Sequence, residues 1–236
     1  MMAPMAVMAD HFENGERIIV TGARIPAREE LADYQLYTFG ERTSVAAQQT
    51  KQVMFLHKDA VTFARVLRYE AGGGSTVDAQ PTTILLRTKN EEARGLGDPL
   101  PRGDARVFAP LIIAGHDLGV LFSGESSTRD TAVGLDWELE TGENHDVTVL
   151  ETVLSETSRD ISRDRSRVTA DMRLEIANAT DATQTVEIVQ PVMGGSQHIA
   201  NENARHAMKD GAPTWTLQAP AHSQLVLTYR VRYIED

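Results

Sequence analysis

Hydrophobic and polar residues alternate along much of the chain from Tyr34 onward. The clearest case is Val168–Ile176, in which apolar residues occupy every second position and charged or hydroxyl residues occupy the positions between them. Gln224–Ile234 repeats this pattern near the end of the chain. Because successive side chains of a strand point to opposite faces of a sheet, both segments predict strands with one buried and one solvent-exposed face.

Shorter segments of the same character, separated by turn-forming residues, predict further strands. They are Tyr34–Phe39, Ser44–His57, Val61–Tyr69, Thr82–Thr88, Ala105–Ile113, Leu118–Ser123, Val133–Leu139, Val147–Leu154, Thr185–Val189 and a short strand containing Trp215 and Leu217. No segment has the hydrophobic spacing of a convincing amphipathic helix. The fold class that we predict is therefore all-β, with Trp215 in the core.

Segments without this alternation predict the connections between strands. Gly72–Ser75 is expected to be a flexible tip, the charged segment Arg159–Arg167 a hairpin tip, and Met193–Gly211 a long loop. Gly95–Phe108 is the most distinctive connection, because its first nine residues contain three glycines and two prolines. Such a stretch cannot continue a helix or a central strand. No helix follows it that could bind a phosphate, so we interpret it as a structural connection between strands.

We divide the chain into a flexible leader or linker at residues 1–33, an N-terminal β-domain at 34–143 and a C-terminal β-domain at 144–236. The pattern across Val168–Tyr233 resembles the Ig-like repeats of bacterial surface proteins, which implies an Ig-like antiparallel β-sandwich for the C-terminal domain. Met1–Met8 is apolar but short and follows no basic region, so we expect no signal peptide in this chain. The tandem methionines predict that the sequence begins inside a longer natural protein.

The charge balance argues against two classes of partner. The formal net charge is −11 and the isoelectric point is near 5.1. Nucleic-acid binding needs a basic face that neutralises phosphates, and an anionic membrane repels an acidic protein. The chain also has no cysteine, which excludes disulfides and thiolate chemistry. No apolar run approaches the roughly 20 residues of a transmembrane helix.

Motifs for catalysis are missing from the sequence. Its seven histidines include no His-Glu-x-x-His zinc motif, and there is no Gly-x-Ser-x-Gly nucleophile motif. Asp136 and Glu138 place two carboxylates about 7 Å apart on one strand face, within the range of a glycosidase pair. The alternative, which we prefer, is the solvent-exposed face of an ordinary strand. Trp137 and Trp215 are candidate sugar-stacking residues.

One possible ligand surface can be named from the residues. Arg159, Arg163 and Arg165 form a local cationic cluster that could bind a carboxylate or a phosphate group. His198 and His206 share a long polar segment of the kind that often carries binding sites. The alternatives are a hairpin tip kept soluble by its charges and a plain surface loop. We predict no catalytic residue, no metal site and no cofactor.

Several short motifs occur in the same order as in a known bacterial family. They are Gln49-Thr50-Lys51-Gln52-Val53, Leu67-Arg68-Tyr69, Gly95–Gly103 and Leu227–Tyr233. With them the chain, from Tyr34 to its end, resembles the C-terminal region of the domain-of-unknown-function family numbered 4139, also called mucoidy-inhibitor-like. The resemblance implies a protein of the periplasm or the cell surface. Family members carry an export signal, a smaller domain and a coiled coil upstream, and that region could form oligomers.

These observations lead to one expected function and two alternatives. We expect a non-catalytic structural or protein-interaction module of the bacterial cell envelope. Its partner would be another envelope protein or a component of the cell wall. The alternatives are a hydrolase or carbohydrate-active enzyme whose site is built from scattered residues, and a carbohydrate-binding sandwich that uses exposed aromatic side chains.

Overall fold

The computed structural model describes residues 27–31, 34–38, 48, 54, 56–58, 60–72 and 76–235. The chain forms two units, Met1–Val61 and Thr62–Asp236. In the first unit, β1 (Ala27–Leu31) pairs antiparallel with β2 (Tyr34–Thr38). In both units the described residues are mainly strands, with one short 3-10 helix, so the all-β prediction is confirmed. The predicted strand Ser44–His57 lies mostly outside the described residues, as do three residues of the predicted Gly72–Ser75 tip.

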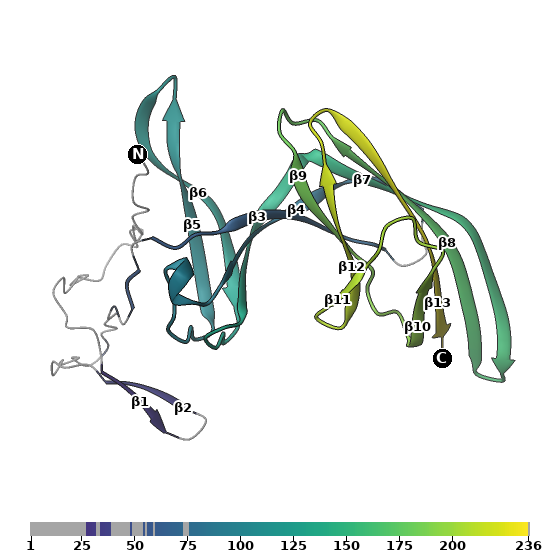
Figure 1. The fold of residues 1–236 in the computed structure, drawn as a ribbon, viewed down its shortest axis with the longest axis horizontal. Helices are drawn as coiled ribbons and strands as arrows, with labels where there is room; N and C mark the ends of the chain where they lie inside the picture. The colour runs from purple at the N-terminus through teal and green to yellow at the C-terminus, as the bar shows by residue number, and fades with distance from the viewer. Residues whose placement is uncertain are drawn as a thin grey trace. The chain divides into compact units, whose positions relative to one another are not determined.

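Nine strands of the second unit form a single sheet (Figure 1). In spatial order they are β10 (Gly195–Ala200), β13 (Ser223–Glu235), β8 (Arg165–Asn178), β7 (Asp136–Ser162), β4 (Val77–Lys89), β3 (Ala64–Glu70), β9 (Gln184–Val189), β12 (Ala212–Ala219) and β11 (Ala207–Lys209). All neighbouring strands are antiparallel except β3 and β9, which are parallel. β7 runs through residue 143, so the predicted division at that residue does not separate two sheets.

The core forms where the two ends of this sheet pack against each other. Trp215 of β12 is fully buried, and its ring centroid lies 4.4 Å from that of Tyr229 on β13. Such an aromatic pair contributes about 1 kcal/mol beyond its buried area. The core position predicted for Trp215 is therefore confirmed. The buried core residues of the four main contributing strands are Val168, Ala170, Met172, Leu174, Ile176, Val186, Ile188, Trp215, Ala219, Leu227, Tyr229, Val231 and Tyr233.

Two of the predicted connections differ from the structure. Met193–Gly211 contains the edge strands β10 and β11, so its prediction as a long loop is wrong. The register of β10 shifts between Gly195 and His198, which breaks the two-residue alternation, and β11 has only three residues. The charged segment Arg159–Arg167 is mostly strand. Only Arg163 and Asp164 separate the two strands.

A long hairpin forms a second, two-stranded sheet of the same unit. It pairs β5 (Gly103–Ile113) with β6 (His116–Thr128), at the two predicted strands. Ala114 and Gly115 make the turn with φ angles of 50° and 80°, as in the two-residue turns that match strand twist. Figure 1 shows most of this ribbon extending away from the nine-stranded sheet.

The glycine- and proline-rich connection between β4 and β5 folds as an ordered structure. A 3-10 helix, η1 (Glu92–Arg94), is followed by Gly95 with φ 87° and Gly97 with φ 99°. These left-handed angles are favourable only for glycine. Leu100 is buried and bridges Thr131. The interpretation as a connection between strands is thus confirmed for residues 95–102, whereas Gly103 to Phe108 belong to β5.

Asn90, at the start of this connection, holds it in place. The fully buried amide Nδ2 donates hydrogen bonds to the carbonyl oxygens of Asp98 (2.8 Å) and Thr131 (3.1 Å), and Oδ1 accepts one from Gly97 N (3.0 Å). We expect Asn90→Ala to lower the free energy of unfolding by about 2 kcal/mol, because buried backbone groups lose their partners. Chemical denaturation checks this. An unchanged denaturation midpoint would show that Asn90 does not stabilise the connection.

Candidate functional site

Five charged side chains form an ion network on one face of the nine-stranded sheet. They come from five strands: Arg68 (β3), Arg87 (β4), Glu138 (β7), Glu187 (β9) and Lys209 (β11). The sheet register places Arg68 opposite Glu187 and Arg87 opposite Glu138. Cross-strand partners lie on the same face, so the pairing of distant segments assembles the network.

Both carboxylates of the network accept hydrogen bonds from its cations. Both terminal nitrogens of Arg87 donate to Glu187 at 2.7 Å, in a bidentate pair. Arg68 donates to Glu138 at 2.9 Å, and Lys209 Nζ donates to the same carboxylate at 2.6 Å. The side chain of Glu187 is only 4% exposed, so this pair is close to a buried salt bridge.

The electrostatic balance keeps both carboxylates ionised. Burial of Glu138 by itself raises the pKa of the carboxyl, but the hydrogen bond from Lys209 and the nearby arginines outweigh it and lower the pKa to about 2. The pKa of Glu187 is also lowered, because Arg87 and its other cationic neighbours outweigh burial. A glycosidase general acid needs a raised pKa. Glu138 is therefore ionised near neutral pH and does not hold the proton that a general acid paired with Asp136 would donate.

The free energy of unfolding should vary with pH through the ionisation of Glu138. Its pKa is lowered from 4.5 to about 2, so the stabilisation is fully present above about pH 4.5 and is lost as the pH falls toward 2. We expect Glu138→Gln to flatten the pH dependence of the unfolding free energy between pH 5 and 3. The matched control is Glu125→Gln, at an exposed ion pair. Parallel profiles for wild type and Glu138→Gln would contradict this prediction.

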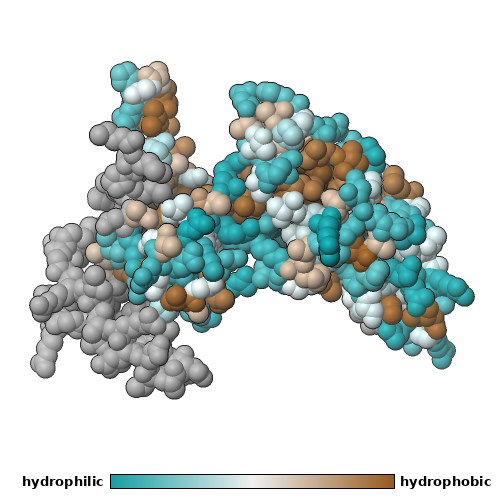
Figure 2. Space-filling view, viewed as in Figure 1, coloured by the Kyte–Doolittle hydropathy of each residue, from teal (hydrophilic) through white to brown (hydrophobic). Residues whose placement is uncertain are grey.

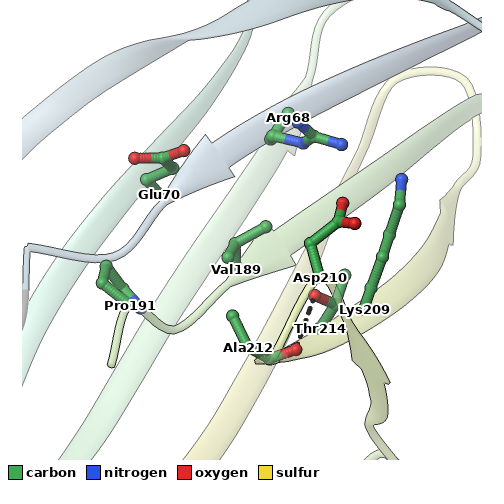
Figure 3. Close-up of a pocket in the computed structure, with 8 residues that line it drawn as sticks. All are labelled: Arg68, Glu70, Val189, Pro191, Lys209, Asp210, Ala212 and Thr214. Atoms are coloured by element: carbon green, nitrogen blue, oxygen red, sulfur yellow. Dashed lines mark hydrogen bonds between the residues drawn. The ribbon is translucent and has the colours of Figure 1, made fainter. Parts of the chain in front are cut away.

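A shallow cavity of about 250 Å³ lies beside the network (Figure 3). The cavity is lined by Arg68 and Lys209 of the ion network and by the acidic residues Glu70 and Asp210. Thr214 carries the one hydroxyl among the described lining residues, and it donates to the carbonyl of Ala212 at 3.3 Å. No general base activates that hydroxyl within the described lining.

A second polar cluster lies inside the core. Glu151 is fully buried, and its Oε2 accepts hydrogen bonds from the Tyr69 hydroxyl (3.0 Å) and the Gly72 N–H (2.8 Å). Burial, together with the charge of Glu151, raises the pKa of Tyr69. The Tyr229 hydroxyl donates to Gln190 at 2.6 Å. These bonds use Oε2 of Glu151 and both tyrosine hydroxyls, whereas Glu151 Oε1 is buried without a hydrogen-bond partner among the described residues.

The structure separates the predicted ligand surface into two places. Arg159 on β7, Arg163 in the turn and Arg165 on β8 are all exposed at the end of the β7–β8 hairpin. His198 on β10 is exposed and lies opposite Arg232 of β13, on the same sheet. His206 is engaged elsewhere.

The ring nitrogen Nδ1 of His206 lies 2.7 Å from Glu202 Oε2, and its ring centroid lies 5.6 Å from that of Trp215. Trp215 Nε1 donates to the same carboxylate oxygen at 2.9 Å. His206 is thus held by the residues around the buried tryptophan. It does not share the exposed arginine surface.

Neither tryptophan is a flat exposed platform. Trp215 is buried, and Trp137 is half-buried with its ring centroid 5.8 Å from that of Phe63. Sugar-stacking platforms need an exposed aromatic face. The two aromatic candidates named from the sequence therefore give no support to a carbohydrate-binding sandwich.

The upper part of the β5–β6 hairpin exposes a group of large apolar side chains, which we call the apolar tip. Its members are Ile112, Ile113, Leu118, Val120, Leu121 and Phe122. Figure 2 shows hydrophobic residues gathered along this part of the ribbon. An isolated two-stranded hairpin is marginally stable in water, and contiguous exposed apolar surface usually marks an interaction site. Sequence reasoning found both strands but missed this surface, because alternation alone does not show which strands lack a covering layer.

Within the described ranges, no group of three or more histidine, aspartate or glutamate residues is placed to hold a metal ion. The same residues include no helix that is long and apolar enough to cross a membrane.

In comparisons with known proteins, no family model, no curated protein and no solved structure matches this chain.

Proposed function

We propose that this chain is a non-catalytic protein-interaction module of the bacterial cell envelope, and that the β5–β6 hairpin contacts its partner. The observation that carries the proposal is the apolar tip. Leu118, Leu121 and Phe122 are each more than half exposed on a two-stranded ribbon. Burying such side chains against a partner contributes about 1.5 to 3 kcal/mol each, which is enough to drive association.

The chemistry of the hairpin favours a protein over a lipid bilayer as its occupant. Among the described residues, β5 and β6 form strand pairs only with each other, so in this part of the chain their outer edges carry backbone N–H and C=O groups without strand partners. In hydrocarbon each unsatisfied backbone group costs several kcal/mol. A protein can pair with a strand edge while it covers the apolar side chains. The partner is therefore a protein with an apolar surface beside an extended segment.

The location and the finer fold are part of the same proposal. The ordered motifs, among them Gly95–Gly103 and Leu227–Tyr233, support membership of family 4139 and a place in the periplasm or on the cell surface. The packing of β8 and β13 across from β9 and β12 supports an Ig-like sandwich. The lowered pKa of Glu138 and the hydrogen-bonded Thr214 favour the module over a hydrolase.

The test removes apolar surface from the hairpin. The tip variant combines Leu118→Ser, Leu121→Ser and Phe122→Ser. A control variant combines Leu135→Ser, Leu154→Ser and Val192→Ser, which are similarly exposed elsewhere in the unit. The wild-type protein and both variants are used to capture proteins from envelope extracts of the source organism. The captured proteins are quantified by mass spectrometry. We expect a defined partner that wild type and control retain and that the tip variant loses by about tenfold or more.

Equal capture by the tip variant would contradict the proposal. So would equal loss from the control variant, since the binding would then follow general hydrophobicity. Circular dichroism of both variants establishes that the fold is retained.

A further inference from the structure

The end of the β7–β8 hairpin separates its charges onto two faces. Arg159 and Arg167 are directly opposite each other across the two strands. Asp160 pairs with Ser166 on the other face, where Glu235 of β13 also lies opposite Ser166. Because strand side chains alternate between faces, the mixed charge run of the sequence becomes one cationic and one acidic surface.

The cationic surface continues onto the two neighbouring strands. Arg232 of β13 lies opposite Thr169 of β8 on one side and opposite His198 of β10 on the other. Thr157 of β7 completes this row by pairing with Thr169. We call the set Arg159, Arg167, Arg232, His198, Thr157 and Thr169 the arginine face. It spans four strands, or about 14 Å.

The three arginines of this face differ from their neighbours in their partners. Arg230 makes a bidentate pair with Asp171, at 2.7 and 2.9 Å, and Arg173 pairs with Glu175 at 3.0 Å. In the described part of the chain, no carboxylate forms an ion pair with Arg159, Arg167 or Arg232. Like charges placed directly opposite on a sheet are destabilising. An anionic ligand would offset the repulsion between Arg159 and Arg167.

We propose that the arginine face binds a carboxylate-bearing linear polysaccharide. Guanidinium groups match carboxylates with two parallel hydrogen bonds, and Thr157 and Thr169, in the row that ends at Arg232, supply hydroxyls for bonds to sugar hydroxyls. Three guanidinium groups on three neighbouring strands fit a polymer with repeated charges better than a single ion. The face has no exposed aromatic residue, whereas protein interfaces are enriched in aromatic anchors.

Shape separates the proposed ligand from other anionic partners. With a net charge of −11, the chain is repelled at long range by every anionic partner, including a polysaccharide, but a membrane, a rigid duplex or a second copy of the chain would also bring its charge close to the acidic remainder of the protein. A flexible polysaccharide can contact the local cationic face and leave the acidic remainder in solvent. This inference is independent of the hairpin contact, and the tip variant should bind the polysaccharide as wild type does.

The test measures binding to polygalacturonate in low salt. The face variant combines Arg159→Gln, Arg167→Gln and Arg232→Gln. The control variant combines Arg94→Gln, Arg102→Gln and Arg129→Gln, exposed arginines on another part of the unit, with the same change in net charge. We expect the face variant to bind at least about tenfold more weakly, the control to bind as wild type, and wild-type binding to weaken as salt rises.

Four outcomes would overturn the inference. They are no binding by wild type, equal binding to neutral dextran, equal weakening in the control variant, and preferential binding to phosphatidylglycerol vesicles or to poly-glutamate. The last pair would assign the face to lipid or to protein instead. Thermal unfolding of both variants checks that their folds are intact.

Discussion

Replacing Glu187 by alanine should lower the free energy of unfolding by about 4 kcal/mol, a large part of the 5 to 15 kcal/mol typical of a domain. Glu187 receives both terminal nitrogens of Arg87 at 2.7 Å and lies 3.4 Å from Arg68 and from Lys209. Removing it leaves three partly buried cations with Glu138 alone. The measurement is urea denaturation near neutral pH.

The control for this prediction is Glu125→Ala. Glu125 pairs with Arg106 at 3.6 Å, but both side chains are about half exposed, so its removal should change stability by less than about 1 kcal/mol. Equal effects of the two substitutions would show that burial of the ion network does not matter. The double variant Glu187→Ala with Arg87→Ala should be less destabilised than the sum of the single variants, because no unpaired Arg87 remains.

Gly124→Ala should destabilise the attachment of the hairpin by about 3 kcal/mol. A β-carbon at Gly124 would lie 2.3 Å from the carbonyl oxygen of Thr141 on β7. The obstacle is backbone, so no side-chain rotation relieves it. The hydrogen bond from Glu140 N to Ser126 Oγ, 3.0 Å long, lies beside this contact and should weaken as well. Hydrogen exchange of the β5–β6 amides, with thermal unfolding, measures the effect.

Gly103→Ala is the matched control, because a β-carbon there meets nothing within 4 Å. It should leave stability unchanged or raise it slightly through the unfolded state. If the hairpin amides exchanged hydrogen as slowly in Gly124→Ala as in Gly103→Ala, the close contact between β6 and β7 would not anchor the hairpin.

Much of the strand pattern could be predicted from the sequence, because it follows from local alternation. Val168–Ile176 and Gln224–Ile234 lie within β8 and β13, and their alternating apolar positions are buried, except Leu225, which is partly buried. Gly95–Gly103 has a composition that excludes regular structure, so it could be identified as a connection. The edge strand β10 was missed, since its register shift hides the alternation.

The candidate sites could not be predicted, because they form where strands distant in sequence pair with each other. Local sequence patterns do not show which strands pair. Arg68 and Glu187 meet because β3 and β9 pair in parallel across 119 positions of sequence. Arg232 was not grouped with Arg159, although the two come within two strands of each other through β8. His206 was grouped with His198 by sequence proximity, but its contacts with Glu202 and Trp215 place it elsewhere.

The most direct test of the proposed interaction is site-specific photo-crosslinking in living cells of the source organism. A photoreactive amino acid is placed at Leu121 in the apolar tip or at Leu154 on β7, which are 56% and 57% exposed. The proposal predicts one or a few defined protein adducts from Leu121 and none of these from Leu154. Identical adducts from both positions, or none from Leu121, would contradict the assignment of the β5–β6 hairpin as the partner-binding element.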